Sequence, residues 1–198
     1  MENLTEKNRK FFDMVARYYD SGILKAWLNG ILERAWRQIK VNNNSKILDA
    51  GCGTGNFLKI LEDENKSLEL YGIDISSQML KIAKNKLKNK AKLSLVAVEK
   101  IKYKNKFDYI FSAEAFHHYE NQDKAMENFN IALKKKGKLI IVDLSFGRIL
   151  NWLFNKIEPG NSKMNSSSDF LKIFKLYKFR NIKQKRLGLF VIMTIGEK

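Results

Sequence analysis

Cysteine is almost absent from this 198-residue chain: Cys52 is the only one, which excludes an internal disulfide. No run of apolar residues reaches the roughly 18 that a membrane-spanning helix needs. Residues 1–7 also lack the apolar core of a signal peptide. These absences favour a cytoplasmic location. The length suits one domain with a sizeable core, and 44% hydrophobic and 29% charged residues are ordinary for a globular protein.

Acidic residues are scarce relative to basic ones, 21 against 37, so the formal net charge is +16. A strongly basic chain can bind nucleic acid or an anionic membrane surface. The excess is mostly lysine, with seven arginines, whereas specific contacts to bases rely on arginine. A solvated basic surface is therefore the favoured interpretation, and RNA or peripheral membrane contact stays open as the alternative.

Glycine is concentrated in one stretch, residues 46–56, with sequence Lys-Ile-Leu-Asp-Ala-Gly-Cys-Gly-Thr-Gly-Asn. An apolar run ends at Asp49, glycines follow at alternate positions, and helical spacing resumes at Phe57, which predicts a strand, a tight turn and a helix. A Rossmann dinucleotide site needs G-x-G-x-x-G, and here Asn56 stands at the third glycine's place. An NAD-dependent oxidoreductase is therefore a weaker alternative. An acid at the strand end suits a ligand with an ammonium group.

A second acid follows the next predicted strand, residues 68–74, which ends at Asp74. A carboxylate at this place can accept hydrogen bonds from both ribose hydroxyls, as in dinucleotide folds. Taken alone, Asp74 is more often a helix cap, but the glycine loop 19 residues earlier reverses that preference. Ser76 is the expected N-cap of the following helix.

Three segments resemble class I S-adenosylmethionine (SAM) methyltransferases that act on small molecules. Residues 48–55 are similar to the family's cofactor loop, residues 72–80 to its G-x-D-x-S-x-x-M-L segment, and residues 12–20 to its F-D-x-[IV]-A-x-x-Y-D opening. The resemblance implies that SAM is the cofactor and that a helix closes over it. It assigns the methionine part to Asp49, Gly51, Cys52 and Gly53, the ribose to Asp74, adenine to Ile75, Met79 and Val98, and the pocket wall to Tyr19, with Ser112 near the sulfonium.

The sequence departs from this family after the third predicted strand, residues 92–98. The family commonly places an acid there that meets the adenine amine, and Ala97 stands at its position. Glu99 or the Val98 backbone would then substitute, or adenine is held less tightly. The usual helix between this strand and the next one, residues 107–112, is missing or vestigial. A SAM-binding module without catalytic activity therefore remains an alternative.

The loop at residues 113–119 contains both histidines of the chain. It resembles the S-x-x-x-L-H-H-[FY] loop of methyltransferases that act on quinones and other small molecules, which makes His118 a candidate base. Two adjacent histidines and an isolated Cys52 predict no metal site. The [DN]-P-P-[FYW] loop of amino methyltransferases is absent. O- or C-methylation of a small, possibly lipophilic acceptor is thus favoured over an RNA methyltransferase.

The predicted fold is α/β: a doubly wound, seven-stranded, mostly parallel sheet in a single domain over residues 1–198. Helices at 8–20 and 21–40 form an N-terminal cap over 1–40, and the core occupies 45–198, with 146–167 as a lid or a membrane-facing segment. Ser168 is expected to cap a helix at 169–177. Strands at 182–187 and 189–195 are expected to form a closing antiparallel hairpin. The sequence does not distinguish a monomer from a homodimer.

Overall fold

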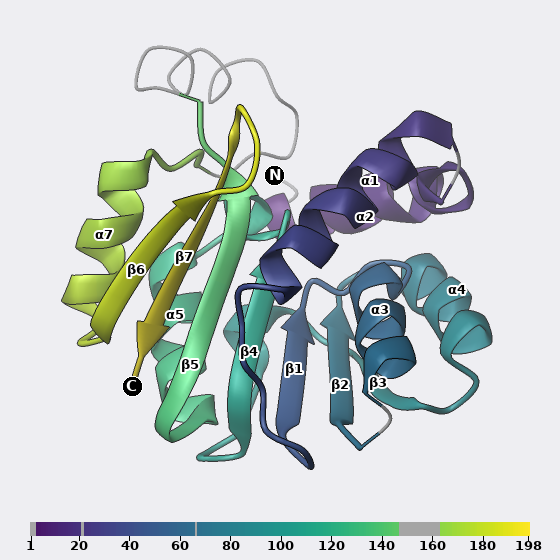
Figure 1. The fold of residues 1–198 in the computed structure, drawn as a ribbon. Coiled ribbons are helices and arrows are strands. Elements are labelled where there is room, and N and C mark those ends of the chain that lie inside the picture. Colours follow the sequence, from purple (N-terminus) through teal and green to yellow (C-terminus); the bar gives the residue numbers. More distant parts are fainter. Residues whose placement is uncertain (1–2, 21, 66, 147–162) are drawn as a thin grey trace.

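The computed structural model describes residues 3–20, 22–65, 67–146 and 163–198, and one seven-stranded sheet runs through them (Figure 1). Its strand order is β3-β2-β1-β4-β5-β7-β6. The first five strands are parallel, whereas β7 runs antiparallel to both β5 and β6. The strands are β1 (Lys46–Ala50), β2 (Glu69–Asp74), β3 (Ala91–Leu95), β4 (Phe107–Ala113), β5 (Leu133–Leu144), β6 (Arg180–Arg186) and β7 (Val191–Glu197). The predicted doubly wound sheet and its closing hairpin are confirmed.

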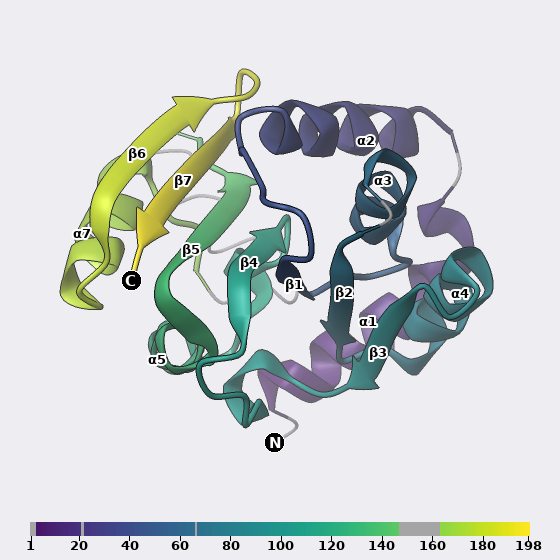
Figure 2. The ribbon, with the colours of Figure 1, turned by 60° about the horizontal axis from the view of Figure 1, so that its bottom comes forward.

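Helices cover both faces of this sheet (Figure 2). Successive strand residues point to opposite faces, so Ile47 packs with α2, α3 and α4, while Leu48 packs with α5 and α7. Helix α1 lies instead over the carboxyl ends of β1 and β2 (Figure 1). The helices are α1 (Leu4–Tyr19), α2 (Gly22–Trp36), α3 (Asn56–Glu64), α4 (Ser77–Leu87), α5 (Gln122–Ala132) and α7 (Ser167–Leu176), with 3-10 turns η1 (Val98–Lys100) and η2 (Phe116–His118).

Several boundaries differ from the sequence prediction. Helix α1 begins at Leu4 rather than at residue 8, and α2 ends at Trp36 rather than at residue 40. Strand β3 ends at Leu95, and Val98 begins the 3-10 turn η1, which is what remains of the third crossover helix. The cap of α7 is Ser166 rather than Ser168, because the Ser166 side chain and Asp169 form a reciprocal capping box. The predicted Ser76 cap of α4 is confirmed, since its hydroxyl accepts a hydrogen bond from the Met79 amide at 3.1 Å.

The expected lid or membrane-facing segment at 146–167 falls largely on residues 147–162, which lie outside the described residues. Within the described part of the chain, no helix is long and apolar enough to span a bilayer.

Candidate functional site

A cavity with an empty volume of about 1030 Å³, part of it open to solvent, lies at the carboxyl ends of the central strands. The chain leaves β1 toward β2 on one side and later returns to β4 on the other, and such a switch point is where open α/β sheets bind ligands. Helix α1 lies over this edge of the sheet (Figure 1). Of the predicted site residues, ten line the cavity: Tyr19, Asp49, Gly51, Cys52, Gly53, Asp74, Ile75, Met79, Val98 and His118.

The glycine loop after β1 is shaped by left-handed backbone conformations. The amides of Gly51 and Cys52 both donate to the Ile73 carbonyl at 2.9 Å, which ties the loop to the end of β2. Gly51 has φ +77°, and a Cβ there would lie 2.5 Å from Ala115 Cβ. Gly53 has φ +50° and would present its Cβ to open space. The first glycine is therefore needed for packing, while the second leaves room for a ligand.

Asp74 is fixed by backbone donors from two loops. Its Oδ2 accepts from the Gly53 amide and its Oδ1 from the Ser76 amide, each at 2.8 Å. Burial raises the pKa of Asp74, although these backbone hydrogen bonds act against that shift. The carboxyl group is thus held in one orientation at the cavity wall, as a ribose-binding role requires.

Asp49 lies near the carboxyl end of β1 and is almost fully buried, with 2% of its surface exposed. Burial, followed by the negative charge of Asp74, raises the pKa of Asp49 to about 8. Two acids close enough to influence each other in a cavity favour a cationic ligand, because a nearby positive charge stabilises the ionised form of both carboxyl groups.

Cys52 belongs to no metal-binding cluster of the described residues. Burial, with the charges of Asp74 and Asp49, raises the pKa of its thiol well above the ordinary value, so the thiol is neutral near pH 7 and a poor metal ligand. Among the described residues, no group of His, Cys, Asp or Glu could hold a metal ion.

Ser112 is the predicted site residue that the structure does not bring to the cavity wall. It is fully buried, and its hydroxyl lies 2.8 Å from the Tyr119 hydroxyl, which also donates to the Ala50 carbonyl at 2.9 Å. The family resemblance placed Ser112 near the sulfonium. In this chain Tyr119, which lines the cavity, is the hydrogen-bond partner of the Ser112 hydroxyl.

The cavity end near β2 and η1 matches a flat, apolar ligand group. Ile75, Met79 and Val98 line it, together with Glu99. The Val98 carbonyl already accepts a hydrogen bond from Asn128 Nδ2 at 2.9 Å. Glu99 Oε1 accepts one from the Asn121 amide at 3.2 Å. Between the two substitutes considered for the missing acid at position 97, the Glu99 side chain therefore has the greater capacity for a further donor.

The two adjacent histidines have different environments. His117 is buried, and its Nδ1 bonds to Asp143 Oδ1 while its amide donates to Asp143 Oδ2 at 3.0 Å. His118 lines the cavity, with its ring 5.1 Å from that of Phe12 in an edge-to-face arrangement. His118 is thus the histidine that can meet a ligand, and His117 fixes the turn.

Glu114 also lines the cavity, although nothing in the sequence distinguished it. It follows β4 directly and has φ +52°, a conformation that a glutamate adopts only when its surroundings hold it there. Burial, followed by the charge of Asp143, raises the pKa of Glu114 to about 8, while His117 opposes the shift. A single glutamate in a loop belongs to no sequence pattern from which its role could be predicted.

Helix α1 is attached to loops from both halves of the sheet. Near its amino end, Asn8 Nδ2 donates to the His118 carbonyl at 2.8 Å. In its middle, Asp13 Oδ1 accepts from Ser76 Oγ at 2.6 Å and from the Gln78 amide at 3.2 Å. Asp13 therefore adds an external carboxylate to the start of α4.

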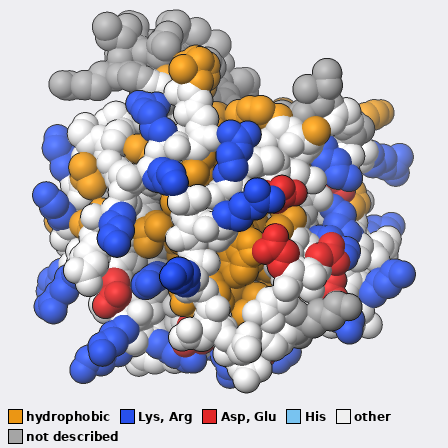
Figure 3. All heavy atoms as spheres, in the orientation of Figure 1, with side chains coloured by type: hydrophobic (Ala, Val, Ile, Leu, Met, Phe, Trp, Pro, Cys, Tyr) orange, Lys and Arg blue, Asp and Glu red, His pale blue; other side chains and the backbone are white. Residues whose placement is uncertain are grey.

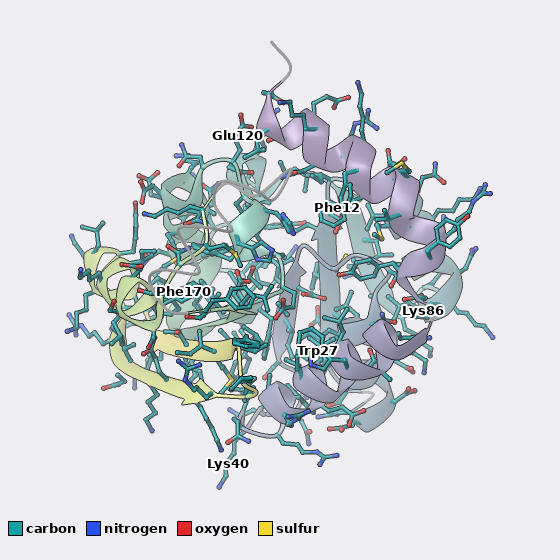
Figure 4. The ribbon with its side chains drawn as sticks, turned by 90° about the horizontal axis from the view of Figure 1, so that it is seen from above. Phe12, Trp27, Lys40, Lys86, Glu120 and Phe170 are labelled. Atoms are coloured by element: carbon teal, nitrogen blue, oxygen red, sulfur yellow. The ribbon has the colours of Figure 1, made fainter. Side chains whose placement is uncertain are left out.

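The carboxyl end of α1 is held by Asp20. Its Oδ1 accepts from Thr54 Oγ1 at 2.7 Å and Asn56 Nδ2 at 2.8 Å, and its Oδ2 pairs with Lys86 Nζ at 2.7 Å. Burial alone would raise the pKa of Asp20, but these hydrogen bonds lower it. Figure 4 shows Phe12 pointing inward from α1, with Glu120 near one end of the helix and Lys86 near the other. Both aspartates of the motif at residues 12–20 thus hold the helix over the cavity.

The charge of the cavity is opposite to that of the chain. Its described lining contains no lysine or arginine, whereas its acids are Asp49, Asp74, Glu99, Glu114 and Glu120. On the face shown in Figure 3, lysines and arginines are spread over many elements rather than gathered in one patch. The basic residues behind the net charge of +16 therefore lie on the surface and not in the described lining of the cavity.

The sheet order and a ligand cavity at its switch point define a nucleotide-binding type of α/β protein. Residues 41–189 match a methyltransferase domain family, and the chain belongs to that family. A demethylmenaquinone methyltransferase of Thermotoga maritima is 31% identical over 68% of this chain and 60% of its own length. The chain spans about 60 to 66% of the length of the first curated relatives that it matches.

Solved structures share the fold. A methyltransferase of Haloferax volcanii, in complex with the Trm112 methyltransferase activator, superposes with a TM-score of 0.82 at 15% identity, covering 94% of this chain and 96% of that one. Phosphoethanolamine N-methyltransferase 2 of Haemonchus contortus, in complex with SAM, superposes with a TM-score of 0.75 at 18% identity, covering 93% and 46%.

Proposed function

We propose that this chain transfers a methyl group from SAM to an oxygen or carbon atom of a small molecule. The observation that carries the proposal is the meeting of Asp49, the glycine loop and Asp74 in one cavity of a methyltransferase domain. SAM bears an ammonium and a sulfonium group, and both suit an acidic cavity. The methyl group on a sulfonium is already electrophilic, so the protein's task is orientation and proximity.

The proposed arrangement follows the cavity from end to end. Asp49 and the loop at 51–55 hold the methionine part, and Asp74 accepts the ribose hydroxyls. Ile75, Met79 and Val98 enclose adenine, with Glu99 accepting from its amine. Tyr19 of α1 closes the pocket. Ser112 has no direct role in this arrangement, because its hydroxyl is used by Tyr119.

The acceptor end of the cavity contains Phe12, Leu28, Leu32 and Ala113, with His118 and Glu114 as polar groups. The absence of lysine and arginine from the described lining disfavours a phosphorylated acceptor such as phosphoethanolamine, or a polynucleotide. It favours an uncharged, hydroxylated aromatic molecule. A naphthoquinol fits this description and is related to the demethylmenaquinone that names the Thermotoga relative.

An RNA methyltransferase remains the alternative, favoured only by the basic surface. It predicts retention of RNA that weakens steeply with salt, and transfer of methyl groups to RNA. A cytoplasmic location and a monomeric or homodimeric state stay predictions.

Calorimetry with SAM and S-adenosylhomocysteine is the first test, and micromolar binding is the expected result. Radiolabelled methyl transfer from SAM is then measured to 1,4-naphthoquinol, phosphoethanolamine and total RNA in parallel. Transfer to the naphthoquinol alone supports the proposal. No SAM binding would contradict the cofactor assignment, and transfer to RNA or phosphoethanolamine would contradict the acceptor.

A further inference from the structure

Glu114 combines a strand hydrogen bond with a left-handed backbone conformation. Its amide donates to the Val142 carbonyl at 2.8 Å, so the residue is still held by β5 at the end of the β4 ladder. Its left-handed conformation, φ +52°, follows directly on that extended strand. This conformation is energetically unfavourable for a non-glycine residue. The surrounding structure therefore maintains an unfavourable conformation at the cavity wall.

One oxygen of the Glu114 carboxyl group also differs from the carboxyl oxygens of Asp74 and Asp143, which accept hydrogen bonds. Asp74 is held by two backbone amides, and Asp143 by the amide and ring of His117. Glu114 Oε1 is buried and has no hydrogen-bond partner among the residues that the structure describes. Two other buried side-chain oxygens of the described residues share this lack, those of Asn29 and Asn165, but neither lines the cavity. An unsatisfied buried polar group is destabilising, and a ligand that supplies a hydrogen bond removes that penalty.

We propose that Glu114 accepts the proton that the acceptor's hydroxyl group loses during methyl transfer. The inference rests on the proposed function above and adds a catalytic residue to it. His118, on the same loop, then contacts and positions the acceptor rather than removing its proton. Both side chains line the same cavity, and the proposal places the hydroxylated ring of the acceptor between them.

The proton and electron balance is simple. The acceptor's O–H bond breaks and its proton goes to the Glu114 carboxylate. The electron pair released on the acceptor forms the new bond to the methyl carbon, at oxygen or, through the ring, at carbon. After attack through carbon, the hydrogen on that ring carbon leaves as a proton to solvent and the ring oxygen regains a proton. The pair of the S–CH₃ bond stays on sulfur and leaves S-adenosylhomocysteine. Protonated Glu114 returns its proton to solvent before the next turnover.

The surroundings of Glu114 support a proton carrier that works near neutral pH. The titratable groups around it are Tyr19 on α1, His117 and His118 on η2, and Asp143 on β5. A pKa raised to about 8 makes the ionised carboxylate a minority below that pH and also a stronger base. The transfer rate of the wild type should therefore rise as the pH increases toward about 8.

The test compares Glu114→Gln, Glu114→Asp and His118→Asn with wild type in methyl transfer to 1,4-naphthoquinol over a range of pH. We expect Glu114→Gln to lower kcat by roughly 100-fold or more, to change KM and SAM affinity little, and to lose the rise of rate with pH. Glu114→Asp should recover part of both. Glu127→Gln, on the exposed face of α5, is the control. A Glu114→Gln variant that keeps the wild-type pH profile, with His118→Asn losing it, would overturn the proposal.

A second measurement does not depend on the acceptor. Infrared difference spectra of the S-adenosylhomocysteine complex should contain a carboxylic-acid carbonyl band that disappears as the pH is raised and is missing in Glu114→Gln. Identical bands in the two proteins would overturn the proposal even if the acceptor assignment holds. A wild type that binds SAM, shows the band and does not methylate the naphthoquinol would instead refute only the proposed acceptor.

Discussion

The carboxyl groups at the two ends of the cavity differ in their hydrogen bonding. At the cofactor end, Asp74 is held by backbone amides of the glycine loop and of α4. At the acceptor end, the Glu114 carboxyl group has a buried oxygen with no hydrogen-bond partner in the described part of the chain. One end is completed by the chain itself and can be recognised as a sequence motif. At the other end the Glu114 side chain awaits a partner, and Glu114 stands at an unspecified position of the loop motif at residues 113–119.

The largest effect that this comparison predicts is at Asp74. Asp74→Asn removes the charge that should accept both ribose hydroxyls, while an amide oxygen remains for one backbone donor. Losing charge-assisted hydrogen bonds worth about 3 kcal/mol lowers SAM affinity by roughly 100-fold. Calorimetry measures this loss.

Asp108→Asn provides the matched control. Asp108 lies near the start of β4, accepts from the Lys46 amide at 2.8 Å and pairs with Lys134, and it does not line the cavity. Its substitution should change stability without changing SAM affinity. Equal losses of affinity in the two variants would show that Asp74 acts through folding rather than through contact.

The second prediction concerns pH. Because the pKa of Asp49 is raised to about 8 in the free protein, a cationic ligand should expel its proton on binding. SAM affinity should then rise by up to about tenfold per pH unit below about pH 8. Calorimetry in buffers of different ionisation enthalpy should detect about one released proton. Asp49→Asn should abolish that release, and unchanged proton release would exclude Asp49 as its source.

Asp49 also makes the stability of the free protein pH-dependent. Its pKa is about 8 when folded, against an ordinary value of 3.8, so the folded state holds more protons between these values. The free energy of unfolding therefore falls as pH rises from about 4 to about 8. Denaturant titrations of wild type and Asp49→Asn should show a shallower decline in the variant.

Much of the cofactor end was predictable because its chemistry is local in sequence. The strand, turn and helix around Asp49 and the strand ending at Asp74 follow from apolar runs, glycines and acids in consecutive positions. The vestigial third crossover was predictable for the same reason, because only a few residues separate the two strands, whereas the seven-stranded doubly wound sheet was expected from the family resemblance. The end of β3 was misjudged by a few residues, because the apolar residues beyond Leu95 pack against the sheet edge from a 3-10 turn.

The remaining parts of the site depend on contacts between distant segments. The aspartates at 13 and 20 were part of a recognised motif, but their partners Ser76 and Thr54 come from loops after β2 and β1. Ser112 lies off the cavity wall, and its hydroxyl bonds to that of Tyr119 seven residues later. Glu114 is distinguished by burial and a left-handed backbone, and neither property can be predicted from the residue type alone.

The third prediction tests whether the glycine loop leaves room for the cofactor. Gly53→Ala places a methyl group in the open space beside the loop, at φ +50°. SAM affinity should fall by at least about tenfold, equivalent to about 1.4 kcal/mol. Gly22→Ala is the control, because Gly22 has φ +71° and also has nothing within 4 Å of an added Cβ. Both variants should lose about 1 kcal/mol of stability, and similar SAM affinities would contradict the loop's role.

The fourth prediction concerns α1, which joins the two ends. Asp20→Asn keeps the shape of the side chain but removes the charge that pairs with Lys86. A partly buried pair of this kind is worth about 1 kcal/mol, so SAM affinity should fall about fivefold and amide exchange in α1 should quicken. Glu6→Gln breaks the exposed pair with Arg9 within α1 and is the control. Unchanged exchange in Asp20→Asn would show that other contacts hold the helix.

The smallest effect is expected at Glu99, the substitute for the acid missing at position 97. A single hydrogen bond from the adenine amine is worth about 0.7 kcal/mol net, so Glu99→Ala should weaken S-adenosylhomocysteine binding about threefold. S-inosylhomocysteine, which lacks that amine, should bind wild type and variant equally. The double comparison isolates the contact from any change in the loop. Equal weakening of both ligands would mean that Glu99 acts only through the Asn121 amide, and that adenine is held by the apolar side chains alone.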